Sequence, residues 1–327
     1  MTVNRKKLLL PTELAKAGWA VLDDRDDIEA VPFSPATTEA ELHAELATAS
    51  GIALWGRPFR AVDVAAAPHL RAVARIGVGY DAVDVPALSA AGVPLLTAGT
   101  ANSASVAEQA MAFMFHLAKA MTEMDAVVRQ GRWGDRYATP VWDLGGRTLL
   151  IVGFGRIGTR LAARCKALEM TVQVYDPYVA ADVITARGCT PVADLDAALP
   201  GADLVSIHCP KSPTSIGMFN AARLALMKPT AWLINTARGG IVDEVALYDA
   251  LTAGKIAGAG LDVFDAEPTP HDNPLLKLPN VVAAPHMAGV SREAMDRMAV
   301  ASVRNLLSVL DGAPNVENVI NKDVLAP

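Results

Sequence analysis

Residues Arg147–Gly158 read RTLLIVGFGRIG, and this stretch decides the fold. Its first part, Leu149–Val152, is a short run of bulky apolar residues, which is typical of a strand buried on both faces in a parallel sheet. The glycines Gly153, Gly155 and Gly158 follow in the spacing G-x-G-x-x-G, and helix-favouring residues come next. The first glycine of such a set makes the turn, the second lets the backbone approach a pyrophosphate, and the third lets helix and strand pack closely. The stretch therefore predicts a dinucleotide-binding turn.

The sequence after this turn supports the same interpretation. A second apolar run, Thr171–Tyr175, follows the expected helix and ends at Asp176, about 20 residues after the glycines, where a carboxylate would bind the ribose hydroxyls. No basic residue follows in Asp176–Val179, so the acid should repel a 2′-phosphate, which favours NAD over NADP. A tight strand-to-helix turn that binds nothing is the alternative, and the complete strand–turn–helix–strand context argues against it.

Bulk composition limits the class of protein. A chain of 327 residues is long for a single core, so two domains are expected. The apolar share of 52% and the charged share of 20% are ordinary for a soluble globular protein. A net charge of −6 argues against nucleic acid or an anionic membrane as partner. The most apolar helical stretch, Val106–Met121, contains Glu108 and Lys119 and is therefore not expected to span a membrane.

The three cysteines, Cys165, Cys189 and Cys209, are scattered and show no metal-ligand spacing. Reduced thiols in a cytoplasmic protein without a metal site are the simplest interpretation.

Short apolar runs alternate with helical patches on both sides of the glycine stretch. The expected strands are Lys7–Leu10, Gly51–Trp55, Arg71–Ile76 and Val93–Thr97 in the first hundred residues, and Leu204–His208, Ala231–Asn235, Gly258–Asp262 and Val281–Ala284 after Asp176. This alternation predicts parallel sheets with one helical crossover per strand. We therefore expect an α/β fold with two doubly wound parallel-sheet domains.

Two long helices are expected between these domains. The first covers Val106–Met121 and is opened by a capping box of Ser105 and Glu108. Ser291 caps the last helix, and the tail Asn315–Ile320 is expected to return to the first domain as a strand. The predicted domains are 1–101 plus 295–327, a flavodoxin-like substrate (catalytic) domain, and 102–294, a Rossmann NAD-binding domain inserted in it. A cleft between them would hold a small substrate.

Polar residues follow several of the expected strands, where the carboxyl ends of a parallel sheet share one edge. They are Arg238, Asp262, Glu267, His286 and His208, the last of them followed closely by Pro210. The turn Gly77–Gly79 could offer backbone N–H groups to a small anion. On composition alone each residue is more often structural or solvated than functional. Their convergence beside a dinucleotide fold favours a reaction at this edge.

Taken together, these motifs resemble the D-isomer-specific 2-hydroxyacid dehydrogenase family, in its phosphoglycerate, glycerate and hydroxypyruvate reductase-like branch. The resemblance covers nearly the whole chain, and the segments that carry it, with Asp176, are RIGVGYDAVDV, NSASVAEQ, GFGRIG, SIHCPKSPTS, INTARGGIVDE, GAGLDVFDAEP and APHMAG. It implies an NAD-dependent oxidoreductase that transfers a hydride between NAD(H) and a small D-2-hydroxy acid or 2-keto acid. It also implies a homodimer, with Val106–Met121 and the loop Trp133–Trp142 as candidate contacts.

The resemblance also implies roles for single residues. His286 would be the acid/base, paired to Glu267, which stabilises the imidazolium, and Arg238 would bind the substrate carboxylate. Val78, Gly79 and Arg75 would share in substrate binding. The implied cofactor contacts are Gly153, Gly155, Arg156, Ile157, Gly158, Asp176, His208, Pro210, Thr236, Asp262 and Gly289.

Departures from the family pattern leave the substrate open. Phosphoglycerate members usually have an arginine near the position of Trp55, and an Asp-Asn pair where this chain has Asp81-Ala82. Arg57 and Arg75 could still meet a second anionic group, so D-3-phosphoglycerate remains an alternative that is not favoured over an unphosphorylated acid. A non-enzymatic NAD-sensing corepressor-like protein is a further alternative. Formate dehydrogenase is disfavoured because its histidine partner is a glutamine.

Overall fold

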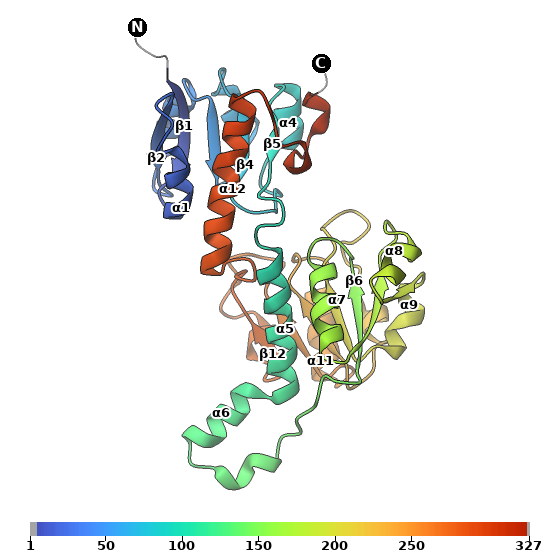
Figure 1. The fold of residues 1–327 in the computed structure, drawn as a ribbon. Helices are drawn as coiled ribbons and strands as arrows, with labels where there is room; N and C mark the ends of the chain where they lie inside the picture. The colour runs from blue at the N-terminus through green and yellow to red at the C-terminus, as the bar shows by residue number, and fades with distance from the viewer. Residues whose placement is uncertain (1–4, 326–327) are drawn as a thin grey trace. The chain divides into compact units, whose positions relative to one another are not determined.

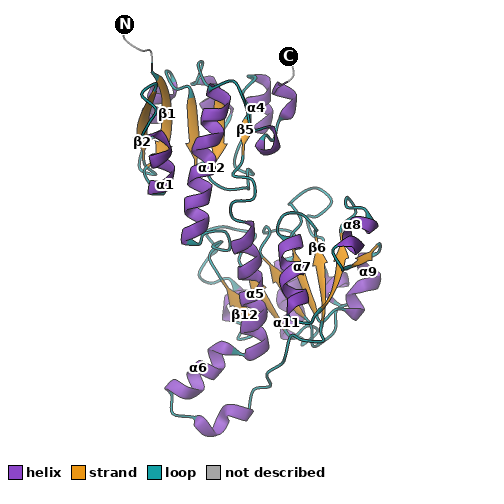
Figure 2. Cartoon of the chain, viewed as in Figure 1, coloured by secondary structure: helices purple, strands orange, loops and turns teal. Residues whose placement is uncertain are grey.

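The computed structural model describes residues 5–325, which form two compact units. Residues up to Asn102 and from Val290 onward make up the terminal unit, and Ser103–Gly289 make up the central unit. Each unit carries one parallel sheet with helices around it, so the predicted α/β class with two parallel sheets is confirmed (Figures 1 and 2). The last long helix, α12 (Arg292–Leu310), lies wholly in the terminal unit, whereas the boundary predicted after residue 294 divides it.

The terminal unit has a five-stranded sheet in the order β2-β1-β3-β4-β5. The strands are β1 (Lys6–Pro11), β2 (Ile28–Phe33), β3 (Gly51–Leu54), β4 (Ala72–Arg75) and β5 (Leu95–Leu96). The helices are α1 (Lys16–Trp19), α2 (Glu39–Leu46), α3 (Ala61–Ala65) and α4 (Val85–Ala90), with α12 packed on β3, β4 and β5. Leu8, Leu9 and Leu10 of the inner strand β1 are completely buried, as expected for a strand covered on both faces.

The chain end differs from its predicted form. Instead of a strand, the residues after α12 form a short 3-10 helix, Val316–Asn318, and one antiparallel bridge between Val319 and Leu96 of β5. The buried side chain of Asn305 donates from Nδ2 to the carbonyl of Thr97, while the Thr97 N–H donates to the Asn318 carbonyl. These bonds satisfy the edge of β5, so that a longer ladder is not formed there.

The central unit has a seven-stranded sheet in the order β12-β11-β10-β9-β6-β7-β8. The strands are β6 (Thr148–Val152), β7 (Thr171–Tyr175), β8 (Thr190–Val192), β9 (Leu204–Ile207), β10 (Trp232–Asn235), β11 (Gly258–Leu261) and β12 (Val281–Ala283). The helices are α5 (Ser103–Lys119), α6 (Met121–Arg129), α7 (Gly158–Ala167), α8 (Ala181–Ala186), α9 (Leu195–Ala198), α10 (Ala221–Leu224) and α11 (Glu244–Thr252). Strand order reverses between β6 and β9, which is the dinucleotide-binding topology.

The start of α5 corrects one prediction. The helix begins at Ser103, so Ser105 is its third residue and not an N-cap, and the predicted capping box is wrong. Ser103 and Ser105 are both buried. Further along, a Cβ on Gly260 of β11 would lie 2.7 Å from the Cβ of Phe113. Glycine in β11 therefore lets α5 lie directly on the sheet.

A protruding segment follows α5. Ala120 adopts a left-handed conformation, with φ 45°, and ends the long helix before α6 begins. Figure 1 shows α6 and the segment after it extending away from the sheet of the central unit. No helix within residues 5–325 is long and apolar enough to cross a membrane.

Candidate active site

The glycine turn after β6 has the geometry that a dinucleotide requires. Gly153 has φ +98°, and a Cβ there would lie 2.6 Å from the backbone nitrogen of Cys209. A Cβ on Gly158 would collide with the carbonyl oxygen of Gly153, so helix α7 can begin here only with glycine. At Gly155, by contrast, the space that a Cβ would enter is open. The turn therefore leaves room at its middle glycine for a close-lying pyrophosphate. Arg156 is exposed and Ile157 half-buried beside it.

Asp176 is fixed at the end of β7 next to this turn. Its Oδ2 accepts a hydrogen bond from the N–H of Phe154 at 2.7 Å, and its Oδ1 accepts from the N–H of Tyr178 at 2.9 Å. The carboxylate thus joins the glycine turn to the loop after β7. A half-buried acid held in this place is positioned to accept hydrogen bonds from ribose hydroxyls.

Two buried polar atoms at the carboxyl ends of β9 and β10 have no hydrogen-bond partner among the described residues. They are Oγ1 of Thr236, after β10, and Nδ1 of His208, after β9. Nε2, the other ring nitrogen of His208, forms a hydrogen bond with Ser206 Oγ at 2.8 Å. Loss of solvation lowers the pKa of His208 to about 3, so the ring is neutral. Buried polar atoms are normally satisfied, and these orphans fit a site completed by a bound cofactor.

His286 and Glu267 are brought together by the loops after β12 and β11. Nδ1 of the imidazole lies 2.7 Å from Oε2 of the carboxylate, while Oε1 accepts from the N–H of Phe264 at 3.0 Å. The side chain of His286 is 48% exposed, so its second nitrogen, Nε2, can reach a ligand. Among residues 5–325, Nε2 has no hydrogen-bond partner. This is the arrangement of an oriented proton donor or acceptor.

Asp262 holds the backbone of His286 and of the two residues that follow it. Its carboxylate is completely buried and accepts from the N–H groups of Met287 at 2.8 Å and Ala288 at 2.9 Å. Its carbonyl accepts from the N–H of His286, whose backbone adopts the left-handed region with φ +54°. Burial raises the pKa of Asp262, and the two amide bonds oppose that shift. Contact between Asp262 and a nicotinamide stays a prediction, as does that of Gly289, which follows Ala288.

Arg238 lies on a turn that the side chain of Asn235 braces. Oδ1 of the buried Asn235 accepts from the N–H of Ala237 at 3.0 Å, and its Nδ2 donates to the carbonyl of Arg238 at 3.0 Å. The guanidinium donates to the Ala237 carbonyl at 2.7 Å.

This turn interlocks with the loop that carries Glu267. Gly239 abuts the backbone of Phe264 so closely that any Cβ would collide with it, and the N–H of Gly240 donates to Oδ1 of Asp265 at 2.6 Å. Arg238 is therefore held beside the loop of the His–Glu pair. Sequence reasoning assigned no role to Asn235 or Asp265. An asparagine that ends a buried strand was the available signal for the first of them.

The predicted substrate residues Arg75, Val78 and Gly79 lie in the terminal unit. Nε of Arg75 donates to the Gly79 carbonyl at 2.9 Å, and Nη1 donates to the Leu54 carbonyl at 2.7 Å. Gly77 has φ +141°, a conformation suited to glycine. Arg75 thus contacts the glycine turn from one side, and its binding of substrate stays a prediction. Binding of a substrate carboxylate by Val78 and Gly79 stays a prediction.

Comparison with known proteins agrees with this geometry. Residues 111–288 match the model of the D-isomer specific 2-hydroxyacid dehydrogenase NAD binding domain. A D-3-phosphoglycerate dehydrogenase of Archaeoglobus fulgidus is 38% identical over 81% of this chain and 50% of its own length. A glyoxylate reductase of Thermofilum pendens is 39% identical over 80% of this chain and 77% of its own length.

A solved structure shows the same two-unit fold. It is an NADPH-dependent glyoxylate/hydroxypyruvate reductase of Sinorhizobium meliloti in complex with NADP and malonate, with a TM-score of 0.83 and 31% identity. The match covers 96% of this chain and 98% of that one. The chain spans about half the length of the archaeal phosphoglycerate dehydrogenases that it matches.

Proposed function

Because the chain belongs to the D-isomer specific 2-hydroxyacid dehydrogenase family, a family of NAD(P)-dependent oxidoreductases, we propose that it transfers a hydride between NAD(H) and a small D-2-hydroxy acid or 2-keto acid. The observation that carries the proposal is the 2.7 Å contact of His286 with Glu267, beside the turn that holds Arg238. These are an oriented imidazole, a carboxylate to stabilise its charge, and a cation for an anionic substrate. A protein that only binds NAD has no use for this set.

In the direction of reduction, bound NADH would supply a hydride to C2 of the keto acid. Nε2 of His286 donates a proton to the carbonyl oxygen as negative charge develops on it. Glu267 accepts a hydrogen bond from Nδ1 of His286. This bond keeps the ring oriented, and the negative charge of Glu267 stabilises the imidazolium form that donates the proton. Arg238 binds the carboxylate through its planar fork and polarises the carbonyl. Oxidation of the hydroxy acid reverses each role.

We propose NAD rather than NADP as the cofactor, because Asp176 presents a fixed carboxylate where a 2′-phosphate would lie. The Sinorhizobium relative is NADPH-dependent, so the family accommodates both cofactors. We expect kcat/KM with NADH to exceed that with NADPH by at least roughly tenfold, the effect of one unfavourable charge contact. Steady-state rates with each cofactor measure this ratio, and a preference for NADPH would contradict the assignment.

An unphosphorylated substrate fits this chain better than D-3-phosphoglycerate. The resemblance implies that phosphoglycerate members usually have an arginine near the position of Trp55, and the Asp-Asn pair that they usually have is Asp81-Ala82 here. The relatives include both phosphoglycerate dehydrogenases and glyoxylate reductases, so family membership alone does not choose between them.

The test of the proposed function is NADH oxidation with a panel of acids: glyoxylate, hydroxypyruvate, pyruvate, phosphohydroxypyruvate and longer 2-keto acids. We expect turnover with at least one unphosphorylated acid. A corepressor-like protein would instead bind NADH, visible as quenched tryptophan fluorescence, without oxidising it in the presence of any acid. That result would overturn the proposal.

A further inference from the structure

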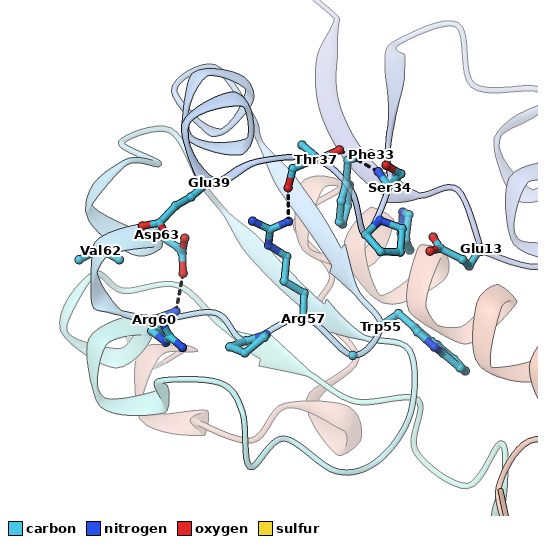
Figure 3. A pocket seen from close by; sticks show the side chains of 14 residues that line it. Glu13, Phe33, Ser34, Thr37, Glu39, Trp55, Arg57, Arg60, Val62 and Asp63 are labelled. Carbon is cyan, nitrogen blue, oxygen red and sulfur yellow. Dashed lines mark hydrogen bonds between the residues drawn. The ribbon is translucent and has the colours of Figure 1, made fainter. Parts of the chain in front are cut away.

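The terminal unit contains a cavity of about 520 Å³, and none of the residues assigned a catalytic or cofactor role lines it. Its walls come from the loops after β1, β2 and β3, and include Phe33, Trp55 and Arg57. Figure 3 shows Arg57 extending across the cavity toward Thr37, with Asp63 and Glu39 on one side and Trp55 and Glu13 on the other. The volume lies within the range of about 300–1,000 Å³ that is usual for small-molecule sites.

The topology of the sheet marks this place as a ligand site. Strand order reverses between β1 and β3, because β2 lies beyond β1 on one side and β4 and β5 lie beyond β3 on the other. Ligands of open α/β sheets bind outside the carboxyl ends of the strands at such a switch point. The cavity opens there, since Pro11 ends β1, Phe33 ends β2 and Trp55 follows β3.

The cavity lies at the carboxyl end of β3, and the turn Gly77–Gly79, where the substrate carboxylate is proposed to bind, follows the neighbouring strand β4. Arg75 joins the two, since its guanidinium donates both to the carbonyl of Leu54, the residue before Trp55, and to that of Gly79. Leu54 and Arg75 are also partners in the ladder between β3 and β4. We place a 2-keto acid with its first carboxylate on the turn and its chain directed past Trp55 into the cavity. Glyoxylate and pyruvate are too short to use it.

Arg57 supplies the cavity with an oriented cationic hydrogen-bond donor. The half-buried guanidinium donates from Nη1 to the carbonyl of Thr37 at 2.7 Å, which fixes its orientation. Within residues 5–325 it has no ion-pair partner, since Asp63 instead lies 2.8 Å from His43 Nε2 and accepts from the N–H of Arg60. An oriented fork of N–H donors matches a carboxylate in two-point contact.

The charge of the lining selects between anions. Three carboxylates, Glu13, Glu39 and Asp63, line the cavity together with two guanidiniums, Arg57 and Arg60. A phosphate dianion would meet more negative than positive charge, whereas a single carboxylate needs only the fork of Arg57. The apolar faces of Phe33 and Trp55 suit the methylene groups that lead to it.

We propose that this cavity binds the far end of the substrate, so that the preferred substrates are straight-chain 2-keto acids, or D-2-hydroxy acids, that end in a second carboxylate paired with Arg57. The inference rests on the proposed function and names its substrate class. Arg57 is a specificity-determining residue in this account and takes no part in hydride or proton transfer.

The test compares 2-oxoglutarate with 2-oxopentanoate, which share a five-carbon chain and differ only in a terminal carboxylate or methyl group. We expect kcat/KM of the wild type to be at least roughly tenfold higher for 2-oxoglutarate, the effect of one charge-assisted contact. Arg57→Gln should lower the value for 2-oxoglutarate by roughly 10- to 100-fold, mainly through KM, and change those for 2-oxopentanoate and glyoxylate less than about twofold.

Two further variants serve as controls. Arg71→Gln removes the same charge from an exposed residue at the opposite end of β4 and should leave the preference intact. Arg57→Lys keeps the charge and loses the fork, so an intermediate preference is expected; it also tests the proposal if Arg57→Gln does not fold. Equal rates with both acids in the wild type, or an equal loss on both in Arg57→Gln, would overturn the proposal. So would an Arg57-dependent preference for phosphohydroxypyruvate over hydroxypyruvate, which would identify a phosphate site.

A binding measurement separates this proposal from the proposed function. We expect 2-oxoglutarate to quench tryptophan fluorescence, with the quench lost in Trp55→Phe and weakened in Arg57→Gln. If no 2-keto acid is reduced but this quench is seen, the reaction is wrong and the cavity assignment stands. If glyoxylate is reduced but 2-oxoglutarate neither binds nor reacts, the reaction stands and the cavity assignment fails.

Discussion

At the scale of single residues, substitutions of His286 and Glu267 should lower the rate of hydride transfer to different extents. His286→Gln removes the proton donor, so we expect kcat to fall by roughly 10²- to 10⁴-fold. Glu267→Gln keeps the hydrogen bond to Nδ1 but removes the charge that stabilises the imidazolium. It should therefore lower kcat, but by less than His286→Gln, because the proton donor itself remains.

The measurements for this pair are kcat and KM for keto-acid reduction, with NADH affinity as the control. Neither residue contributes to the glycine turn, so NADH should bind both variants with nearly the wild-type dissociation constant. Wild-type turnover in both variants would show that the pair is structural.

His208 should make the protein sensitive to acid. In the folded chain its pKa is about 3, below the ordinary value of 6.5. Between these pH values the unfolded chain takes up a proton that the folded chain does not, so folding stability falls as pH drops through 6.5. The loss is up to about 1.4 kcal/mol per pH unit. Urea unfolding at pH 7 and pH 5 measures it. His208→Gln should reduce the slope by the contribution of one proton, and an unchanged slope would contradict the assignment.

At the scale of secondary-structure elements, the sequence pattern found every strand except β2 and β8, each of which lies at one edge of its sheet. The inner strands of both sheets are short apolar runs, and their predicted positions are confirmed to within a residue or two. Strand β2 carries Glu29 and Pro32, and its mixed burial reflects an edge strand with one solvated side. Strand β8 is only three residues long. Neither has a pattern that distinguishes it from a loop.

The residues of the candidate site could also be predicted only in part from the sequence. Residues after strand ends could be placed on one edge from the sequence, because parallel strands bring their carboxyl ends together. The contact of Gly240 with Asp265 depends instead on how two loops approach in three dimensions, which no local pattern encodes. The cavity beside Arg57 likewise forms only when three separate loops fold over the sheet.

The segment from α6 to residue 142 supports a prediction about assembly. Trp133 is 64% and Tyr137 82% exposed, and the guanidinium of Arg136 lies 4.5 Å from the centre of the Tyr137 ring and 5.9 Å from that of Trp133. Exposed aromatic clusters of this kind mark contact surfaces. We propose that they bind a second copy of the chain, the homodimer that the resemblance implies.

Sedimentation velocity tests this proposal. The wild type should sediment with the mass of two 34.3 kDa chains, and the double variant Trp133→Ser, Tyr137→Ser with the mass of one. Tyr178→Ser, an equally exposed tyrosine elsewhere in the central unit, is the matched control and should remain dimeric. A monomeric wild type, or a dimeric double variant, would exclude this surface as the interface.

At the scale of the whole molecule, the two units divide the work that the proposed reaction requires. The central unit holds the glycine turn, Asp176 and the His286–Glu267 pair, all placed by one seven-stranded sheet. The terminal unit holds a second carboxyl-end edge, with the turn Gly77–Gly79 and the cavity beside Arg57. We therefore propose that the central unit carries out the reaction and that the terminal unit determines which acid undergoes it.

Transfer of deuterium is the most direct test of the central claim. The chain would be incubated with NADH that carries deuterium at both C4 positions of the nicotinamide and with the 2-keto acid that it reduces fastest. The product would be analysed by mass spectrometry and chiral chromatography. The account predicts one deuterium at C2 of a D-2-hydroxy acid. A product without deuterium, a product of L configuration, or no hydroxy acid from any 2-keto acid would contradict it.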